Sequence, residues 1–285
     1  MNLNFVFVCI LFFSSCSQQR LAFRFADTAV SWKADDYFDI TSGQKDAVKT
    51  HLKLFFKKAY EHNDQEIPKI FERADKILSA VNDQNKIDCR GVEKITAQSG
   101  NVFSDVIKLS ATNIQNLIQT LNEKQIQYFI KQVAKKIKED EEKLEKNSER
   151  EERRLNRNLD NSKLFLGSLS DEQESALRIH IKNNPFPSAE QLKNNKENFK
   201  KLKIASTTQE GFQKFFLDYI QNWRDHQSIT YLKLSDDLRK QNEIFYQNLV
   251  CQASTKQLKH LRQKLSEIKK DFEEFFIHKD DTASI

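Results

Sequence analysis

The densest group of side chains that could carry out chemistry lies in the stretch WKADDYFD, residues 32–39. Its carboxylates are Asp35, Asp36 and Asp39. If a helix continues through the stretch, Asp35 and Asp39 share one face, and paired carboxylates can bind a cation or act in acid–base catalysis. The alternative interpretation is that the aromatic residues of the stretch anchor the core, while the aspartates cap and solvate the helix.

The remaining sequence contains no recognised catalytic motif. It has no glycine-rich phosphate loop, no GxSxG nucleophile elbow and no HExxH motif. None of the six histidines follows a glutamate by three residues, as the ligands of di-iron bundles do. No CxxC pair or Cys/His cluster indicates a metal. We therefore predict no catalytic residue, no metal and no cofactor, and we interpret the protein as non-enzymatic.

The N-terminal segment MNLNFVFVCILFFSSCSQQR has the order of a secretion signal. Residues 5–13 are all apolar, which suits the core of a signal peptide but not a membrane span of about 20 helical residues. Cys16 follows Ser14 and Ser15, and polar residues come next. The alternatives are an ordinary signal peptide with a chance cysteine, or a cytosolic start.

This order resembles the lipobox of bacterial lipoproteins, in which the signal is cut just before a cysteine that carries lipid. The resemblance implies a signal peptide over 1–15, lipidation of Cys16 and a lipidated tether over 16–20. Ser17, in place of Asp, favours the outer membrane, with the protein facing the periplasm. Several acyl chains would hold it there stably.

Two cysteines remain in the expected mature chain. Cys9 leaves with the signal and Cys16 carries lipid, so Cys89 and Cys251 are left. In an oxidising periplasm they could form one disulfide; the alternative is two buried free thiols.

Six short motifs predict helix starts by one device. Each places a capping residue three positions before a glutamine, so that the cap accepts from the N3 amide and the glutamine side chain reaches back to the N-cap amide. The motifs are Thr41–Gln44, Asn122–Gln125, Ser170–Gln173, Ser188–Gln191, Ser206–Gln209 and Ser254–Gln257.

Composition and apolar periodicity predict an all-α protein. Only 5 glycines and 3 prolines are present, too few for the turns of a sheet protein. Apolar stripes with helical spacing run over 48–59, 126–137, 212–223 and 258–275, the last with the spacing of a coiled-coil seam. Such faces must pack together, so we expect a multi-helix bundle or array.

Charge dominates the stretch 131–160, which we interpret as a long charged helix that is either a solvated arm or a linker. We expect an N-terminal helical half over 21–145, a charged helical connection over 146–167, a C-terminal helical half over 168–279 and a disordered tail over 280–285. The net charge of +5, from 46 basic against 41 acidic residues, is too weak to indicate nucleic acid.

Several ordered segments resemble a family of uncharacterised lipoproteins of Gram-negative bacteria. They are WKADDYFDITSGQ, EIPKIFERADKIL, LNEKQIQYFIKQ, SEREERRLNRNLD and LGSLSDEQESALRIHIKNNP. The resemblance covers residues 16–200. It implies an all-helical fold and an envelope location, and it carries over no catalytic residue.

Two of the capping motifs carry a second resemblance. Leu121–Gln125 and Leu169–Gln173 are similar to the paired LTxxQ motifs of small helical periplasmic chaperones and stress sensors. In that family the motifs start helices of a curved dimer that cradles unfolded clients. The alternative is that LTxxQ is a good capping box that unrelated helical proteins reach independently.

Together these observations predict a membrane-anchored periplasmic lipoprotein that binds proteins, as a chaperone-like or envelope-scaffold module. Its expected partners are the membrane, through the lipid anchor, and other envelope proteins or unfolded clients; nucleic acid is not expected. One alternative is a cation-binding or hydrolytic protein that uses Asp35, Asp36 and Asp39. Another is a purely structural bridge between envelope components.

Overall fold

The computed structural model describes residues 26–63, 65–80 and 87–277. These residues form helices and no strand, which confirms the predicted all-α class. The helices are α3 (Ala26–Phe38), α4 (Ser42–Asn63), α5 (Glu66–Ser79), α6 (Cys89–Gln119), α7 (Glu123–Glu145), α8 (Asn147–Leu166), α9 (Asp171–Asn183), α10 (Ser188–Ala205), α11 (Gln209–Gln221), α12 (Ile229–Cys251) and α13 (Thr255–Ile277).

Three sequence predictions lie outside the described residues. They are the signal peptide over 1–15, the lipidated Cys16 with its tether over 16–20, and the tail over 280–285. Among the helices that the structure does describe, none combines the length and the hydropathy that a membrane crossing requires.

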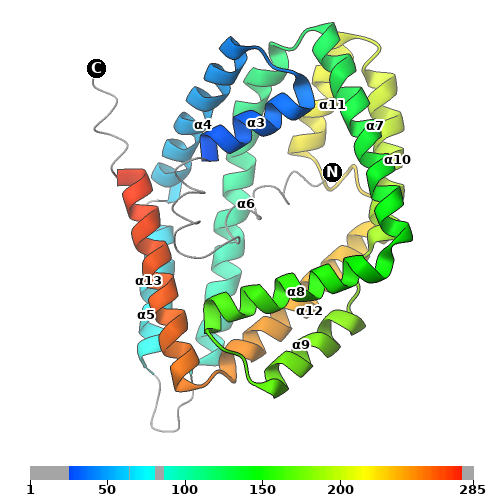
Figure 1. Cartoon of the computed structure of the whole chain (residues 1–285). Coiled ribbons are helices and arrows are strands. Elements are labelled where there is room, and N and C mark those ends of the chain that lie inside the picture. Colours follow the sequence, from blue (N-terminus) through cyan, green and yellow to red (C-terminus); the bar gives the residue numbers. More distant parts are fainter. Residues whose placement is uncertain (1–25, 64, 81–86, 278–285) are drawn as a thin grey trace.

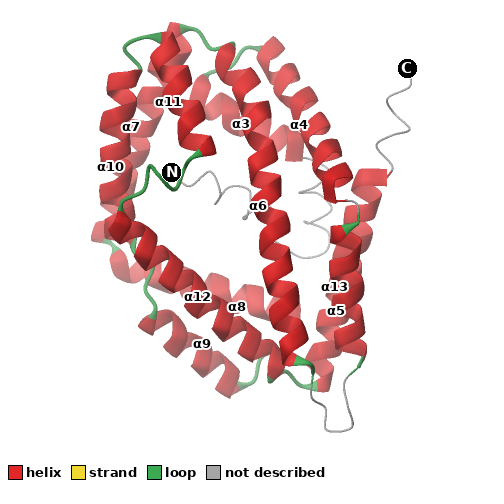
Figure 2. Cartoon of the chain, turned by 180° about the vertical axis from the view of Figure 1, so that it is seen from behind, coloured by secondary structure: helices red, strands yellow, loops and turns green. Residues whose placement is uncertain are grey.

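The helices follow an oval outline (Figure 1). One end is formed by α3, α4 and α11, and the opposite end by α8, α9 and α12. Helices α7 and α10 run along one side and α5 and α13 along the other, while the long α6 connects the two ends (Figure 2). The protein is therefore a helical frame in which each element contacts only a few neighbours.

Aromatic packing holds the first end of the frame together. Phe38, the last residue of α3, stacks on Phe129 of α7 with ring centroids 4.5 Å apart. Phe212 and Phe216 of α11 meet the Phe129 ring edge-on, at 5.8 and 5.5 Å. The apolar stripes predicted from the sequence for α7 and α11 thus face one shared core, which also contains Leu121 of the turn before α7.

A second core lies where α5, α6, α8, α12 and α13 meet. Leu258 of α13 is 1% exposed and packs with Leu78 of α5, Leu166 of α8 and Leu249 of α12. A third, smaller cluster joins α8 to α9 through Leu159 and its neighbours.

The two helices of the charged stretch pack against other helices of the frame, so the stretch is not a solvated arm. It divides at Lys146 into α7 and α8. In α8, Leu159 and Leu166 are 6% and 3% exposed. The buried Arg154 guanidinium donates a hydrogen bond to the Ile181 carbonyl of α9 at 3.3 Å. Burial of these few side chains places a highly charged helix within the folded body.

Helices of the two expected halves pack on each other. Helix α5 packs on α13, α7 packs on α10, and α6 packs on both α11 and α12. The α5–α13 contact also carries an ion pair, in which Arg262 donates to the two Asp75 carboxylate oxygens at 2.6 and 3.2 Å. Arg262 thereby lowers the pKa of Asp75.

Two of the six capping motifs start their helices differently from the prediction. Pro187 is the N-cap of α10, and the Ser188 hydroxyl donates to the Phe186 carbonyl at 3.2 Å. Ser206 ends α10, and its hydroxyl donates to the Leu202 carbonyl at 2.7 Å, so Thr208 caps α11 instead. In both cases the serine hydroxyl points to a preceding main-chain carbonyl instead of accepting from the amide three residues later.

A disulfide joins Cys89, the first residue of α6, to Cys251, the last residue of α12. Their Cα atoms are 5.7 Å apart, and the bond closes a chain segment with a sequence separation of 162. The Cα distance falls in the usual range for disulfides. The bond ties the start of α6 to the end of α12.

We expect the double variant Cys89→Ala, Cys251→Ala to lose about 2–4 kcal/mol of unfolding free energy, because the bond restricts a long segment of the unfolded chain. Denaturant unfolding under oxidising conditions measures the loss. As a control, a reductant should bring the wild type to the stability of the double variant and leave the double variant unchanged. A wild type that is indifferent to reductant would contradict this role.

Candidate functional site

Four capping boxes meet in two pairs, and these pairs are the most distinctive polar sites of the described residues. In the first pair, the Thr41 amide donates to Gln44 Oε1 at 2.9 Å, and the Gln44 amide donates to Thr41 Oγ1 at 3.3 Å. Asn122 and Gln125 make the same reciprocal bonds at 3.1 and 3.0 Å. The first turns of α4 and α7 are thus capped by side chains that lie next to each other.

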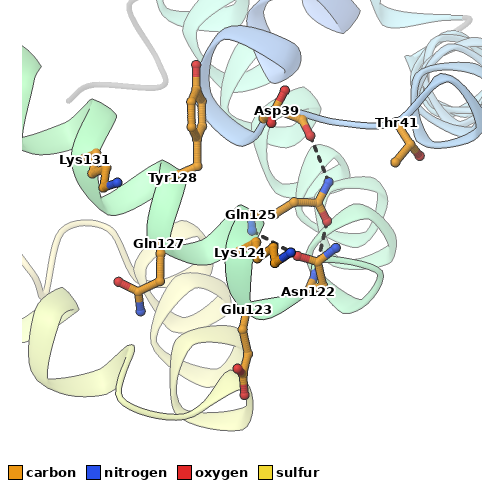
Figure 3. Close-up of a pocket in the computed structure, with 9 residues that line it drawn as sticks. All are labelled: Asp39, Thr41, Asn122, Glu123, Lys124, Gln125, Gln127, Tyr128 and Lys131. Carbon is orange, nitrogen blue, oxygen red and sulfur yellow. Dashed lines mark hydrogen bonds between the residues drawn. The ribbon is translucent and has the colours of Figure 1, made fainter.

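The two glutamines of this pair also bind each other. Gln125 Nε2 donates to Gln44 Oε1 at 2.7 Å, and Gln44 Nε2 faces Gln125 Oε1 at 3.3 Å. Each amide nitrogen also donates to a main-chain carbonyl just after the end of a helix. Gln125 donates to the Asp39 carbonyl after α3, and Gln44 donates to the Thr120 carbonyl after α6, both at 3.1 Å. Figure 3 shows Gln125 between Asp39 and Asn122. We call this arrangement the first glutamine junction.

A second glutamine junction repeats the arrangement with Gln173 of α9 and Gln257 of α13. Gln257 Nε2 donates to Gln173 Oε1 at 2.7 Å and to the Ser168 carbonyl at 2.7 Å, while Gln173 Nε2 faces Gln257 Oε1 at 3.3 Å. Ser170 and Ser254 supply the two caps, at 3.3 Å each. Gln125 and Gln257 are 5% and 7% exposed, while Gln44 and Gln173 are half-buried, so each junction reaches from the interior to the surface.

The turns that lead into the two junctions also correspond. Asp39 lies five residues before Gln44, and Ser168 lies five residues before Gln173. Among the described residues, the only positive φ angles are 49° at Asp39 and 78° at Gly167. The turns α3–α4 and α6–α7, which form the first junction, thus correspond to the turns α8–α9 and α12–α13, which form the second.

Sequence reasoning identified the four capping boxes but not which of them meet. The partners are separated by 81 residues in the first junction and by 84 in the second. This near-equal spacing was the available signal. The two motifs singled out as similar to paired chaperone motifs, at Gln125 and Gln173, belong to different junctions.

The three aspartates of the N-terminal stretch face different partners. Helix α3 ends at Phe38, so Asp39 does not share a helix face with Asp35. Lys45 pairs with Asp35 at 2.7 Å, and Lys33 pairs with Asp36 at 3.5 Å. Asp39 contributes its main-chain carbonyl to the first glutamine junction. In the described part of the chain, no group of three or more His, Cys, Asp or Glu side chains could hold a metal ion.

The aromatic residues of that stretch also separate. Phe38 is a core residue at 8% exposure, and Tyr37 packs partly buried against the same core. Burial raises the pKa of the Tyr37 phenol, and the carboxylates of nearby acids add to the effect. Trp32 is 68% exposed, so it does not anchor the core as expected.

Two of the histidines make specific contacts on separate parts of the frame. His180 of α9 stacks on Phe245 with ring centroids 4.2 Å apart, and its Nε2 lies 2.8 Å from Asn242 Oδ1. His226 Nε2 lies 2.8 Å from Asp218 Oδ2. Hydrogen bonds from Asn222 and then from His226 lower the pKa of Asp218. The first contact links α9 to α12, and the second links α11 to the turn that follows it.

A shallow, open groove lies beside the first glutamine junction (Figure 3). Its walls carry both signs of charge together with amide and hydroxyl groups, so they favour no single class of small ligand. The lining residues are Asp39, Thr41, Asn122, Glu123, Lys124, Gln125, Gln127, Tyr128 and Lys131.

The fold and the two junctions define an all-helical frame protein whose turns are locked by paired side-chain amides. Residues 36–232 match a family of unknown function, DUF6279. The match spans more than half of the chain, so the protein belongs to this family, and the expectation of an uncharacterised family is confirmed in that coarser form. No curated protein matches the chain, and no solved structure does.

We expect Gln125→Ala and Gln257→Ala each to cost about 1–3 kcal/mol of unfolding free energy, because each removes a buried amide and leaves part-buried groups without their hydrogen bonds. The matched control is Gln191→Ala, which belongs to a motif of the same spacing but whose side chain donates to the Tyr231 hydroxyl, at 3.2 Å, instead of joining a junction. Its expected cost is at most about 1 kcal/mol. Urea unfolding measures all three, and equal losses at Gln125, Gln257 and Gln191 would count against the junctions.

Proposed function

We propose that the protein is a non-enzymatic, protein-binding module of the bacterial envelope, anchored by lipid on Cys16 in the outer membrane and facing the periplasm. The observation that best supports this location is the Cys89–Cys251 disulfide. Disulfides persist in oxidising compartments such as the periplasm and are rare in the cytosol. A leader that resembles a lipoprotein signal supports the same compartment independently.

The binding role is supported by apolar side chains that the frame leaves in solvent. Ile229 of α12 is 86% exposed, Ile204 of α10 is 73% exposed and Ile179 of α9 is 57% exposed. They are spread over several helices instead of lining one pocket. Dispersed apolar contacts suit an extended or unfolded chain better than a compact small molecule.

The rigid arrangement of these helices supports the binding of client proteins rather than catalysis. The two glutamine junctions fix the turns of the frame, and the disulfide ties α6 to α12. In the chaperones that the LTxxQ motifs resemble, two chains form the cradle. In this proposal a single chain supplies both ends of the frame.

Metabolic labelling with an alkynyl palmitate analogue tests the anchor. The wild-type protein should be labelled and should fractionate with the outer membrane, while Cys16→Ser should be unlabelled. An unlabelled wild type, or equal labelling of Cys16→Ser, would refute the lipid anchor.

Aggregation of a reduced, unfolded model client tests the binding role. The soluble part that lacks residues 1–16 should slow light scattering at an equimolar ratio. The triple variant Ile179→Ser, Ile204→Ser, Ile229→Ser should lose most of this effect while its circular dichroism is unchanged, because the serines cannot contact apolar segments of the client.

The matched control for this experiment replaces exposed lysines on two of the same helices, Lys200→Ser and Lys233→Ser, and it should hold clients as the wild type does. A wild type that fails to slow aggregation of any client would refute the holding function. So would a triple isoleucine variant that holds clients as well as the wild type.

A further inference from the structure

Trp32 lies on the outward face of α3. The inward face consists of Ser31, Ala34 and Phe38, which pack against the rest of the frame, with Ser31 only 1% exposed. On the other side, the exposed residues around the Trp32 indole, which is itself 68% exposed, are Ala29, Lys33 and Asp36. Because tryptophan carries a large apolar ring, covering this exposed indole with an apolar surface would be favourable.

The chemistry of this face suits a lipid–water interface. Tryptophan is enriched at the headgroup level of membranes, where its ring is shielded and its N–H stays hydrated. The charges beside it compensate each other, because Lys33 Nζ lies 3.5 Å from the Asp36 carboxylate. The Lys33 ammonium also lies 4.9 Å from the centre of the Tyr37 ring. The face is therefore apolar at its centre and close to neutral around it.

The position of α3 in the chain brings this face close to the proposed anchor. Nine residues, 17–25, separate Cys16 from the start of α3 at Ala26. Even fully extended, a segment of that length reaches at most about 35 Å. Trp32 lies only about 9 Å further along the helix axis. A lipid on Cys16 would thus keep Trp32 within reach of the membrane at all times.

We propose that the outward face of α3, centred on Trp32, lies against the headgroup region of the membrane that anchors the chain. This inference rests on the proposed lipid anchor. The contact would orient the frame, because α3 lies at one end of the oval and α8, α9 and α12 form the other (Figure 1). The end that carries Ile179 and Ile229 would then project away from the membrane, toward clients.

The chain contains two tryptophans, Trp32 and Trp223, so each can be made the sole reporter. The full lipidated protein is reconstituted into vesicles of phosphatidylethanolamine and phosphatidylglycerol, as Trp223→Phe and as the matched control Trp32→Phe. We expect Trp223→Phe to show a blue-shifted emission and strong quenching by lipids brominated near the headgroup. Trp32→Phe should show neither change.

Salt separates this contact from an electrostatic one. Because Lys33 and Asp36 compensate each other, the quenching of Trp32 should persist in high salt. The unsubstituted protein, in which both indoles report, should show the quenching in part, so the result does not depend on the folding of one variant.

Flotation of the same vesicles separates the two proposals. Protein that floats while Trp32 stays unquenched by brominated lipid and open to aqueous acrylamide overturns the membrane contact and leaves the anchor intact. Quenching that disappears in high salt also overturns the contact, because a nearly neutral face cannot owe its binding to charge. Protein that does not float overturns both the anchor and the contact.

Discussion

The structure depends on pairs of glutamine side chains whose amide groups face each other across two helix starts. Glutamine suits this position because one terminal group carries both an acceptor and two donors. In each junction the oxygens accept from the N-cap main chain and from the partner amide, while the nitrogens donate to the partner or to a carbonyl of a neighbouring turn. A residue that ordinarily only caps its own helix thereby also links two helix starts that are far apart in the sequence. A glutamate could not replace it without losing the donor.

The junctions explain why a frame with small, separate cores keeps one shape. The first junction joins the start of α4 to the start of α7 at one end, and the second joins the start of α9 to the start of α13 near the other. Helix α6 runs between the two ends, and the disulfide joins its beginning to the last residue of α12. Polar groups with a single satisfied arrangement specify geometry in a way that interchangeable apolar contacts do not. The same arrangement of turns, caps and paired glutamines thus stabilises both ends of the frame.

Local signals in the sequence predicted the helices and four of the capping boxes, because these depend on residues three or four positions apart. The predictions at Ser188 and Ser206 were wrong for another local reason, since each hydroxyl points to a preceding carbonyl and the helix starts at a neighbouring residue. The pairing of Gln44 with Gln125 was not predictable from local spacing, because it depends on the tertiary approach of distant turns. The burial of Arg154 and Leu159 was likewise hidden by the charged composition around them. The exposure of Trp32 reverses the usual expectation for a tryptophan, and for that reason it points toward a contact outside the frame.

A double-mutant cycle at the second junction tests the central claim most directly. Unfolding free energies of the wild type, Gln173→Ala, Gln257→Ala and the double variant, measured in urea under one set of conditions, give the coupling between the two amides. The account predicts a coupling energy of about 1–2 kcal/mol, as for hydrogen-bonded neighbours. Losses that add to within about 0.3 kcal/mol would show that the two glutamines act independently, and would contradict the claim that their pairing holds the frame.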